Sequence, residues 1–364
     1  LTKTMDAAAG VVISASHNPV ADNGVKFFSG NGFKLPDALE DEIAERIEKT
    51  GNWPTGEGVG RVRTEITAWH RYVEFLMQKC VSLKGLKVVV DGAHGAASHV
   101  APYLLTQLGA DVVPINVEPN GVNINVECGS THPAGLQVSV LAHGADAGLA
   151  YDGDADRVIA VDEKGQLVDG DHILAICGLD LLRQGKLKKN TIAATLYSNV
   201  GLRMAMGKEG GEVLITQAGD RYVLETMLAS GLSLGGEQSG HVIFLEHSTT
   251  GDGLLTGLQL LSVMQRTGRQ LSELAAQMPK LPQRLVSVPV CSPAWEDNQA
   301  IVAALGEAQR LLLGQGRILV RASGTEPLIR VMAEGTDAQR VEELVKSIAE
   351  VIDRELGQGV PGRG

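Results

Sequence analysis

Residues 10–19 read GVVISASHNP, a short apolar run followed by a polar stretch, and similar apolar runs recur through most of the chain. The β-branched residues 11–13 predict a short buried strand, and the polar residues 14–19 predict a turn that ends it. Similar runs alternate with amphipathic stretches along the sequence, which is typical of parallel sheets with crossover helices. Open α/β sheets bind ligands at the carboxyl ends of their strands. Ser16 therefore lies where a phosphorylatable nucleophile would sit, although an ordinary polar loop explains this stretch equally well on its own.

The bulk composition excludes several classes of protein. A length of 364 residues favours about two to four domains, because single cores seldom grow to that size. The net charge of -11 argues against a nucleic-acid partner, since phosphate backbones are bound chiefly through clustered Lys and Arg. The 4 cysteines are widely spaced, which argues against a zinc site or a disulfide framework and fits a cytoplasmic location. No apolar run approaches membrane-spanning length, so we expect no membrane association.

The order of predicted elements gives an α/β fold class. We predict three α/β domains with mixed, mainly parallel sheets, a C-terminal α+β domain, and a central cleft. The first predicted strand follows Leu1 so closely that we expect an amino-terminal portion of the first domain to be missing. The stretch 278–284, flanked by prolines, predicts a linker. The predicted boundaries are 1–80 for the truncated first domain, 81–166 for the second, 167–280 for the third, 281–357 for the fourth, and 358–364 for a disordered tail.

A second informative loop, residues 152–157, reads DGDADR and lies between two apolar runs. Its carboxylates at alternate positions are those of Asp152, Asp154 and Asp156. Small residues between them let all three point at one hard cation, and oxygen ligands favour Mg2+. A calcium-binding EF-hand is one alternative, since Glu163 falls at its twelfth position, but Arg157 stands where that loop requires glycine. A solvated acidic turn is the other alternative.

A third loop, residues 235–241, reads GGEQSGH and alternates polar side chains with glycines. Glu237 accepts hydrogen bonds, Ser239 donates or accepts them, and the glycines allow a polar ligand such as a sugar to approach the backbone closely. His241 ends the loop. Upstream, Arg221 lies at a predicted helix start, where a cation beside exposed amides suits an anionic group. Taken alone, this loop is explained better as a glycine-rich turn with a structural histidine.

A fourth loop, residues 321–330, reads RASGTEPLIR and joins two predicted strands. Two guanidinium groups and two hydroxyls around a glycine suit a phosphate, because the turn's N–H groups form an anion nest and Arg adds bidentate hydrogen bonds. A surface turn with salt-bridged arginines is an equal alternative. The candidate phosphate-binding residues are Arg321, Ser323, Gly324, Thr325 and Arg330.

Together, the four loops indicate a phosphosugar held between domains for phosphoryl transfer. A phosphate on Ser16 would carry about -1.5 to -2 charges at pH 7. Beside three carboxylates that charge is strongly unfavourable, so a divalent cation must bridge them. The same cation would polarise the phosphoryl group that is to be moved.

In this order the motifs resemble those of the α-D-phosphohexomutase superfamily, and the resemblance spans essentially the whole chain. It rests on residues 14–35, 151–162, 219–222, 235–241 and 321–335. The resemblance implies a Mg2+-dependent cytoplasmic isomerase that converts glucosamine 6-phosphate to glucosamine 1-phosphate, for UDP-N-acetylglucosamine and cell-wall precursor synthesis. It implies a phosphoserine, and a glucose or glucosamine 1,6-bisphosphate as intermediate or activator.

The resemblance also assigns roles to residues. Ser16 is then the phosphoserine, and it joins the three aspartates as a Mg2+ ligand. Lys26 resembles the family's general acid/base, with His17 beside the nucleophile, while His241 assists from the third loop. Arg157 would steady the phosphoserine. The third loop, with Arg221 upstream, would hold the sugar, and the five candidates of the fourth loop would bind the phosphate that does not react.

Three alternatives to this function stay open. Only Gln238 and the GDRY sequence at 219–222 favour glucosamine over glucose or mannose, so a phosphomannomutase/phosphoglucomutase is the first. The second is a non-catalytic phosphosugar sensor, and the third is a phosphatase that hydrolyses its own phosphoserine. The expected partner is a hexosamine phosphate, and the sequence leaves a homodimer open.

Overall fold

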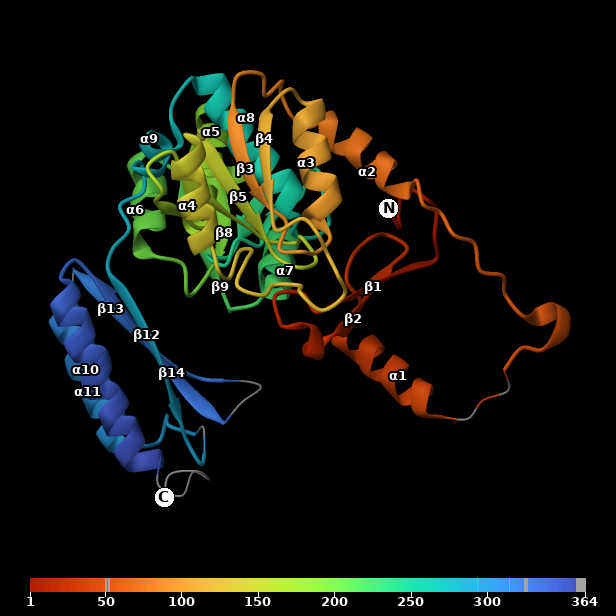
Figure 1. The fold of residues 1–364 in the computed structure, drawn as a ribbon. Helices are drawn as coiled ribbons and strands as arrows, with labels where there is room; N and C mark the ends of the chain where they lie inside the picture. Colours follow the sequence, from red (N-terminus) through yellow and green to blue (C-terminus); the bar gives the residue numbers. More distant parts are fainter. Residues whose placement is uncertain (50, 52, 293, 314, 324–326, 358–364) are drawn as a thin grey trace. The chain divides into compact units, whose positions relative to one another are not determined.

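A computed structural model describes residues 1–49, 51, 53–292, 294–313, 315–323 and 327–357 (Figure 1). The chain forms two compact units. The first contains Leu1–Ser198 and Ala205–Met278, and the second contains Asn199–Met204 and the described part of Pro279–Gly364. Within the described ranges, a helix with the length and apolar composition of a bilayer span is absent. The predicted tail 358–364 lies outside the described residues.

The first predicted loop lies between the strands of an antiparallel pair, β1 (Ala9–Ser14) and β2 (Gly24–Ser29). The prediction that residues 11–13 are buried is wrong, because these three side chains are 55%, 38% and 71% exposed. Among the described residues β1 pairs with β2 alone, and a two-stranded sheet cannot bury its own faces. The segment continues through 3-10 turns at Val20–Asp22 and Gly56–Gly58 and through the helices α1 (Asp37–Glu48) and α2 (Ala68–Met77).

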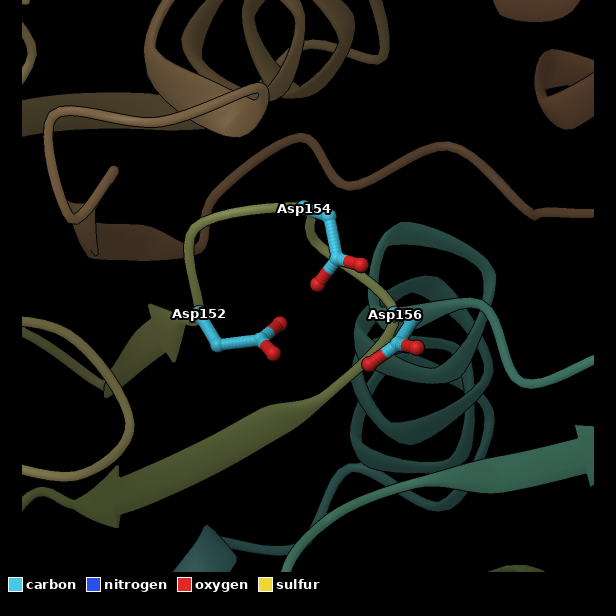
Figure 2. A group of neighbouring side chains, drawn as sticks. All are labelled: Asp152, Asp154 and Asp156. Atoms are coloured by element: carbon cyan, nitrogen blue, oxygen red, sulfur yellow. The ribbon is translucent and has the colours of Figure 1, made fainter. Parts of the chain in front are cut away.

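The second segment is built on a mixed sheet. Its elements are β3 (Lys87–Asp91), α3 (Ala97–Gln107), β4 (Asp111–Ile115), α4 (Ala134–His143), β5 (Ala147–Tyr151), β6 (Val158–Asp162) and β7 (Leu167–Val168). The strand order is β4-β3-β5-β6-β7, with β3 parallel to both its neighbours and the remaining pairs antiparallel. Leu136 of α4 packs against Val89 on one face. Asp152 follows β5 directly, at the edge where the parallel strands end (Figure 2).

The third segment carries another mixed sheet, in the order β11-β10-β8-β9. Its elements are α5 (Gly170–Arg183), a 3-10 turn (Lys188–Asn190), β8 (Thr191–Thr195), α6 (Val200–Lys208), β9 (Glu212–Thr216), α7 (Asp220–Ser230), β10 (Leu234–Gly236), β11 (Val242–Phe244), α8 (Gly253–Thr267) and α9 (Leu271–Ala275). β8 runs parallel to β9 and β10, and β11 is antiparallel to β10. Val223 and Met227 of α7 pack against this sheet. The third predicted loop therefore connects β10 to β11.

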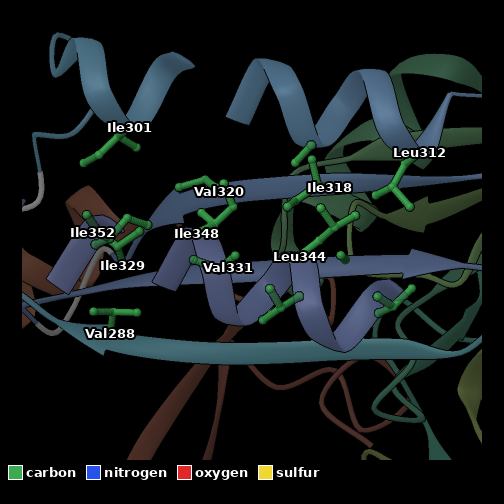
Figure 3. Packing of buried hydrophobic residues seen from close by; sticks show 14 of the residues in the cluster. Val288, Ile301, Leu312, Ile318, Val320, Ile329, Val331, Leu344, Ile348 and Ile352 are labelled. Carbon is green, nitrogen blue, oxygen red and sulfur yellow. The ribbon is translucent and has the colours of Figure 1, made fainter. Parts of the chain in front are cut away.

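The second compact unit is built on an antiparallel sheet in the order β12-β14-β13. Its elements are β12 (Gln283–Pro289), α10 (Gln299–Leu312), β13 (Gly316–Ala322), β14 (Leu328–Gly335) and α11 (Ala338–Leu356). Figure 3 shows Ile301 of α10 and Ile348 of α11 in one apolar cluster with Val320 and Val331 of the sheet. Side chains alternate between the faces of a strand, so the sheet's other face carries the neighbouring positions, Arg321 among them.

The predicted fold class is confirmed, since mixed sheets with helices precede an α+β unit. The predicted linker 278–284 is wrong at its end, because β12 already begins at Gln283. Its last two residues, Gln283 and Arg284, pair with Glu334 and Ala333 of β14 and so belong to the strand.

Candidate active site

The DGDADR loop joins β5 to β6 and gathers three carboxylates. One ligand oxygen from each of Asp152, Asp154 and Asp156 lies within 4.8 Å of the others (Figure 2). Each side chain also has a buried oxygen without a hydrogen-bond partner among the described residues. These atoms are Oδ2 of Asp152, Oδ1 of Asp154 and Oδ1 of Asp156. Buried carboxylate oxygens are costly unless they coordinate a cation or accept hydrogen bonds. The donor set therefore fits a hard divalent cation such as Mg2+.

The charges of this loop act on one another. Burial, followed by the negative charges of Asp156 and Asp154, raises the pKa of Asp152 to about 8. Burial acts on Asp156 in the same direction, but the neighbouring His241, Lys26 and Arg157 hold its pKa below the ordinary value. A bound cation would favour the ionised form of all three carboxyl groups, which is the form that binds a metal.

The EF-hand alternative is excluded by the elements that flank the loop. β5 and β6 form an antiparallel hairpin, whereas an EF-hand loop lies between two helices. Glu163, the expected twelfth ligand, instead accepts a hydrogen bond from the Ser272 N–H at 3.1 Å. The loop is therefore a hairpin connection.

The nucleophile candidate Ser16 lies against this hairpin loop. The N–H of Gly153, between two of the aspartates, donates to the Ser16 carbonyl oxygen at 3.0 Å. Ser16 has a φ of 53°, in the left-handed region, and its own N–H donates to Ser14 Oγ at 3.0 Å. The Ser16 hydroxyl lies 3.4 Å from His17 Nδ1. Burial and the charge of Arg157 lower the pKa of His17, which favours a neutral imidazole beside the hydroxyl.

Two cationic side chains lie at the acidic loop. Lys26 of β2 forms an ion pair with Oδ2 of Asp154 and lies 3.2 Å from Oδ2 of Asp156. Burial opposes the ammonium form, but the charges of these two carboxylates raise the pKa of Lys26. The buried Arg157 Nε lies 3.8 Å from Asp156 Oδ1 and lacks a hydrogen-bond partner in the described part of the chain. The oxygens that Lys26 contacts are therefore different atoms from the three carboxylate oxygens that lack hydrogen-bond partners among the described residues.

The third loop, residues 235–241, also lies against the acidic loop. The N–H of Val158, which begins β6, donates to the Gly240 carbonyl oxygen at 3.1 Å, and Glu237 Oε1 accepts the Gly219 N–H at 3.1 Å. The imidazole of His241 is 2% exposed; its Nδ1 lies 3.6 Å from Asp156 Oδ1. Ser239 is exposed at the loop surface. The second, first and third predicted loops are therefore in contact.

Two residues that are not among the predicted site residues, Lys34 and Asp220, also lie at this site. Lys34, which follows β2, forms an ion pair with Asp220 in the first turn of α7. Burial opposes ionisation of Asp220, but the charges of Lys34 and His241 lower its pKa. Asp220 precedes the candidate Arg221 in the GDRY sequence, and Lys34 lies within residues 14–35, which carry part of the family resemblance. Arg221 itself donates to Glu225 at 2.9 Å.

A cavity of about 420 Å³ lies between β2 and α7. Its charged and polar lining includes Lys26, Lys34, Asp220, Arg221 and His241. Its walls are apolar, with Phe33 and Leu224 among them. The structure thus brings Lys26, Arg221 and His241 together at one concave surface, which suits a small ligand with polar groups.

The fourth loop belongs to the second compact unit. Arg321 of β13 and Arg330 of β14 are direct cross-strand partners, so both guanidinium groups lie on one face of the sheet. The Ser323 N–H donates to the Leu328 carbonyl oxygen at 2.9 Å and closes the turn. Gly324 and Thr325 lie outside the described residues. Like charges directly opposite each other are destabilising, and an anion would relieve them.

Comparison with known proteins gives the family. Four models of the phosphoglucomutase/phosphomannomutase family match the chain: alpha/beta/alpha domain I at residues 1–52, domain II at 70–165, domain III at 169–281 and the C-terminal domain at 285–351. A phosphoglucosamine mutase of Symbiobacterium thermophilum is 55% identical over 98% of this chain and 80% of its own length. That of Heliobacterium modesticaldum is 54% identical over 97% of this chain and 82% of its own length.

Solved structures agree at the level of the fold. A phosphoglucomutase/phosphomannomutase family protein of Burkholderia thailandensis matches with a TM-score of 0.76 and 24% identity, over 96% of this chain and 76% of its own. The N-acetylphosphoglucosamine mutase of Aspergillus fumigatus, solved with GlcNAc-6P and magnesium, has a TM-score of 0.75 and 21% identity, over 96% of this chain and 90% of its own. With these matches along its whole length, the chain belongs to the phosphoglucomutase/phosphomannomutase family and, within it, to the phosphoglucosamine mutases.

Proposed function

We propose that this protein converts glucosamine 6-phosphate to glucosamine 1-phosphate by passing a phosphoryl group through Ser16. The observation that carries the proposal is the contact of Ser16 with the acidic loop, through the 3.0 Å hydrogen bond from Gly153. A nucleophile and a cation site must adjoin if one phosphoryl group is to be held by both. Relatives that are 50% to 55% identical are named for this reaction, and they favour glucosamine over the glucose and mannose alternative.

The acidic loop and its cationic neighbours would hold the reacting group. Bound Mg2+ would neutralise and polarise the phosphoryl oxygens. Asp152, Asp154 and Asp156 would coordinate it through the oxygens that lack partners, with Ser16 as a further ligand. Arg157, whose buried Nε has no hydrogen-bond partner among the described residues, would donate to the phosphoserine.

The cycle needs proton transfer at two atoms. In the first half, the Ser16 Oγ–P bond breaks, an O–P bond forms at the free sugar hydroxyl, and that hydroxyl's proton passes to a base. The resulting 1,6-bisphosphate turns around and returns its other phosphoryl group to Ser16 by the reverse steps. His17 Nδ1 lies 3.4 Å from the Ser16 hydroxyl, so it suits the group that gives a proton to Ser16 Oγ in the first half and takes it back in the second. Lys26, held as an ammonium by two carboxylates beside the unphosphorylated Ser16, suits the group that takes the sugar hydroxyl's proton in the first half and returns it to the sugar oxygen in the second.

The remaining candidates would orient the sugar phosphate. Glu237 and Ser239 would bind sugar hydroxyls, with His241 and Arg221 at the adjoining cavity. The fourth loop would grip whichever phosphate is distal, so that one nucleophile serves both ends of the hexose. Four domains, with the boundaries expected from the sequence, would supply one loop each.

We expect Arg321→Met to raise KM for glucosamine 6-phosphate about 10- to 100-fold with a smaller change in kcat, because a charge-assisted bidentate contact is lost. Steady-state kinetics measure both constants. Arg340→Met is the matched control, since Arg340 lies on α11 with a side chain that is 42% exposed, and its Nη1 lies 3.7 Å from Glu343 Oε2. A KM equal to that of the control would contradict a phosphate role for Arg321.

The proposed reaction is tested by incubating the purified chain with glucosamine 6-phosphate, Mg2+ and a trace of glucose 1,6-bisphosphate. Phosphorus NMR should show glucosamine 1-phosphate accumulating. Release of inorganic phosphate alone would identify a phosphatase, and bound but unaltered ligand would identify a sensor. Faster isomerisation of glucose or mannose 6-phosphate would overturn the proposed substrate.

A further inference from the structure

Asn125 lies in the long loop between β4 and α4 and reaches the nucleophile from outside every motif of the sequence. Asn125 is 7% exposed. Its backbone N–H donates to the Ala93 carbonyl oxygen at 3.0 Å, and its φ of 59° is left-handed. Asparagine tolerates this conformation better than most residues. The backbone thus fixes where the side-chain amide points.

The Asn125 amide group donates two hydrogen bonds to the nucleophile loop. Its Nδ2 donates to the Ser16 carbonyl oxygen at 2.7 Å and to the Asn18 carbonyl oxygen at 2.8 Å. The Ser16 carbonyl oxygen also accepts the Gly153 N–H at 3.0 Å. Two donors from separate loops therefore converge on one carbonyl oxygen, next to the side chain that is to react.

Gly153 makes this convergence sterically feasible. A Cβ atom at this position would lie 2.4 Å from the Ser16 carbonyl oxygen and 2.9 Å from Asn125 Nδ2, closer than real Cβ contacts allow. The acidic loop can approach the nucleophile loop only because residue 153 has no side chain.

Ser16 needs such support. A serine at a φ of 53° is in a sparsely populated conformation, which persists only where the surroundings over-determine it. The strand that leads into the loop contributes little packing, since Val11 and Ile13 are 55% and 71% exposed. Hydrogen bonds from the second segment are therefore what fixes the position of the serine relative to the aspartates.

We infer that Asn125 is a positioning residue that holds Ser16 in its left-handed conformation and in register with the acidic loop. The inference rests on the proposed phosphoryl transfer through Ser16. Asn125 is not among the residues proposed to bind the sugar or the metal ion. It acts through the Ser16 and Asn18 carbonyl groups. Its loss should therefore affect the rate of phosphoryl transfer and leave substrate and metal affinity largely intact.

The test compares Asn125→Asp with Asn123→Asp. The first removes both donors at nearly constant volume and sets carboxylate oxygens against two carbonyl oxygens. The second makes the same chemical change in the same loop, where Asn123 donates to the Glu118 carbonyl oxygen at 3.0 Å and not to the nucleophile loop. We expect kcat to fall about 100-fold in Asn125→Asp, because misplacing a reacting group by about 1 Å costs that much. KM for glucosamine 6-phosphate and the half-saturating Mg2+ concentration should stay near their wild-type values.

A second measurement follows the phosphorylation of Ser16 by itself. Phosphorylation of Ser16 by glucose 1,6-bisphosphate, followed by intact mass, should slow in parallel with kcat. Asn125→Ala removes the donors without adding charge, so kcat and the rate of Ser16 phosphorylation should fall together here too, but by a smaller factor. A kcat equal to that of Asn123→Asp, or a change confined to KM, overturns the inference. So does loss of the thermal unfolding transition in both Asn125 variants, since Asn125 would then be structural. An inactive wild-type chain would instead overturn the proposed function.

Discussion

Replacing Ser16 by alanine should abolish mutase turnover while glucosamine 6-phosphate still binds. In the proposed cycle Ser16 Oγ is the atom that carries the phosphoryl group between the two ends of the sugar, and no route remains without it. The groups proposed to bind the sugar phosphate belong to other loops. Turnover is measured by phosphorus NMR, and binding by calorimetry with glucosamine 6-phosphate. Intact mass after exposure to glucose 1,6-bisphosphate should show no added phosphoryl group.

Ser29→Ala is the matched control for this variant. Ser29 ends β2 in the same antiparallel pair, and its hydroxyl donates to the Phe33 carbonyl oxygen at 3.2 Å. Its removal should leave turnover and mass labelling unchanged. Turnover in Ser16→Ala at the control's rate would defeat the nucleophile assignment, whatever the fate of the metal site.

Asp154→Asn should raise the half-saturating Mg2+ concentration by at least about 100-fold, because even outer-shell partners of a metal commonly contribute 10- to 100-fold to affinity. The variant keeps the shape of the side chain but loses the negative charge on an oxygen that lacks a partner among the described residues. It also removes the ion pair with Lys26. Calorimetric Mg2+ titration measures the effect directly, and the Mg2+ dependence of turnover measures it a second time.

Asp111→Asn makes the same charge change at an exposed end of the second segment's sheet. The Asp111 side chain is 72% exposed, and its carboxylate lies 3.9 Å from Lys87 Nζ. Its Mg2+ titration should match that of the wild-type protein. A normal titration curve for Asp154→Asn as well would remove the acidic loop as the cation site.

The sequence was informative where function depends on local order. Alternate aspartates between two apolar runs predicted a loop that closes on one cation, and the structure shows Asp152 following β5 and three carboxylates gathered together. The strand β3 (Lys87–Asp91) is likewise indicated by its own residues, because consecutive β-branched residues favour strands. Adjacent residues decide both features.

Features that depend on distant segments were not predictable in the same way. Lys34 and Asp220 are 186 positions apart, and nothing in either neighbourhood marks them as partners. Asn125 and Ser16 are separated by 109 positions, and the amide reaches the serine only through the path of a long loop. Burial of residues 11–13 was predicted from their composition, but burial requires a covering layer that a strand's own sequence does not specify.

Gly153 constrains how this enzyme can be re-engineered. A library that randomises the acidic loop to alter metal preference would appear free to vary any residue other than the three aspartates. The codon for residue 153 should nevertheless be left untouched, because even an alanine methyl group would collide with the Ser16 carbonyl oxygen. Variants there would fail by pushing the serine loop away, and a screen that reads only activity would mistake that failure for lost metal binding.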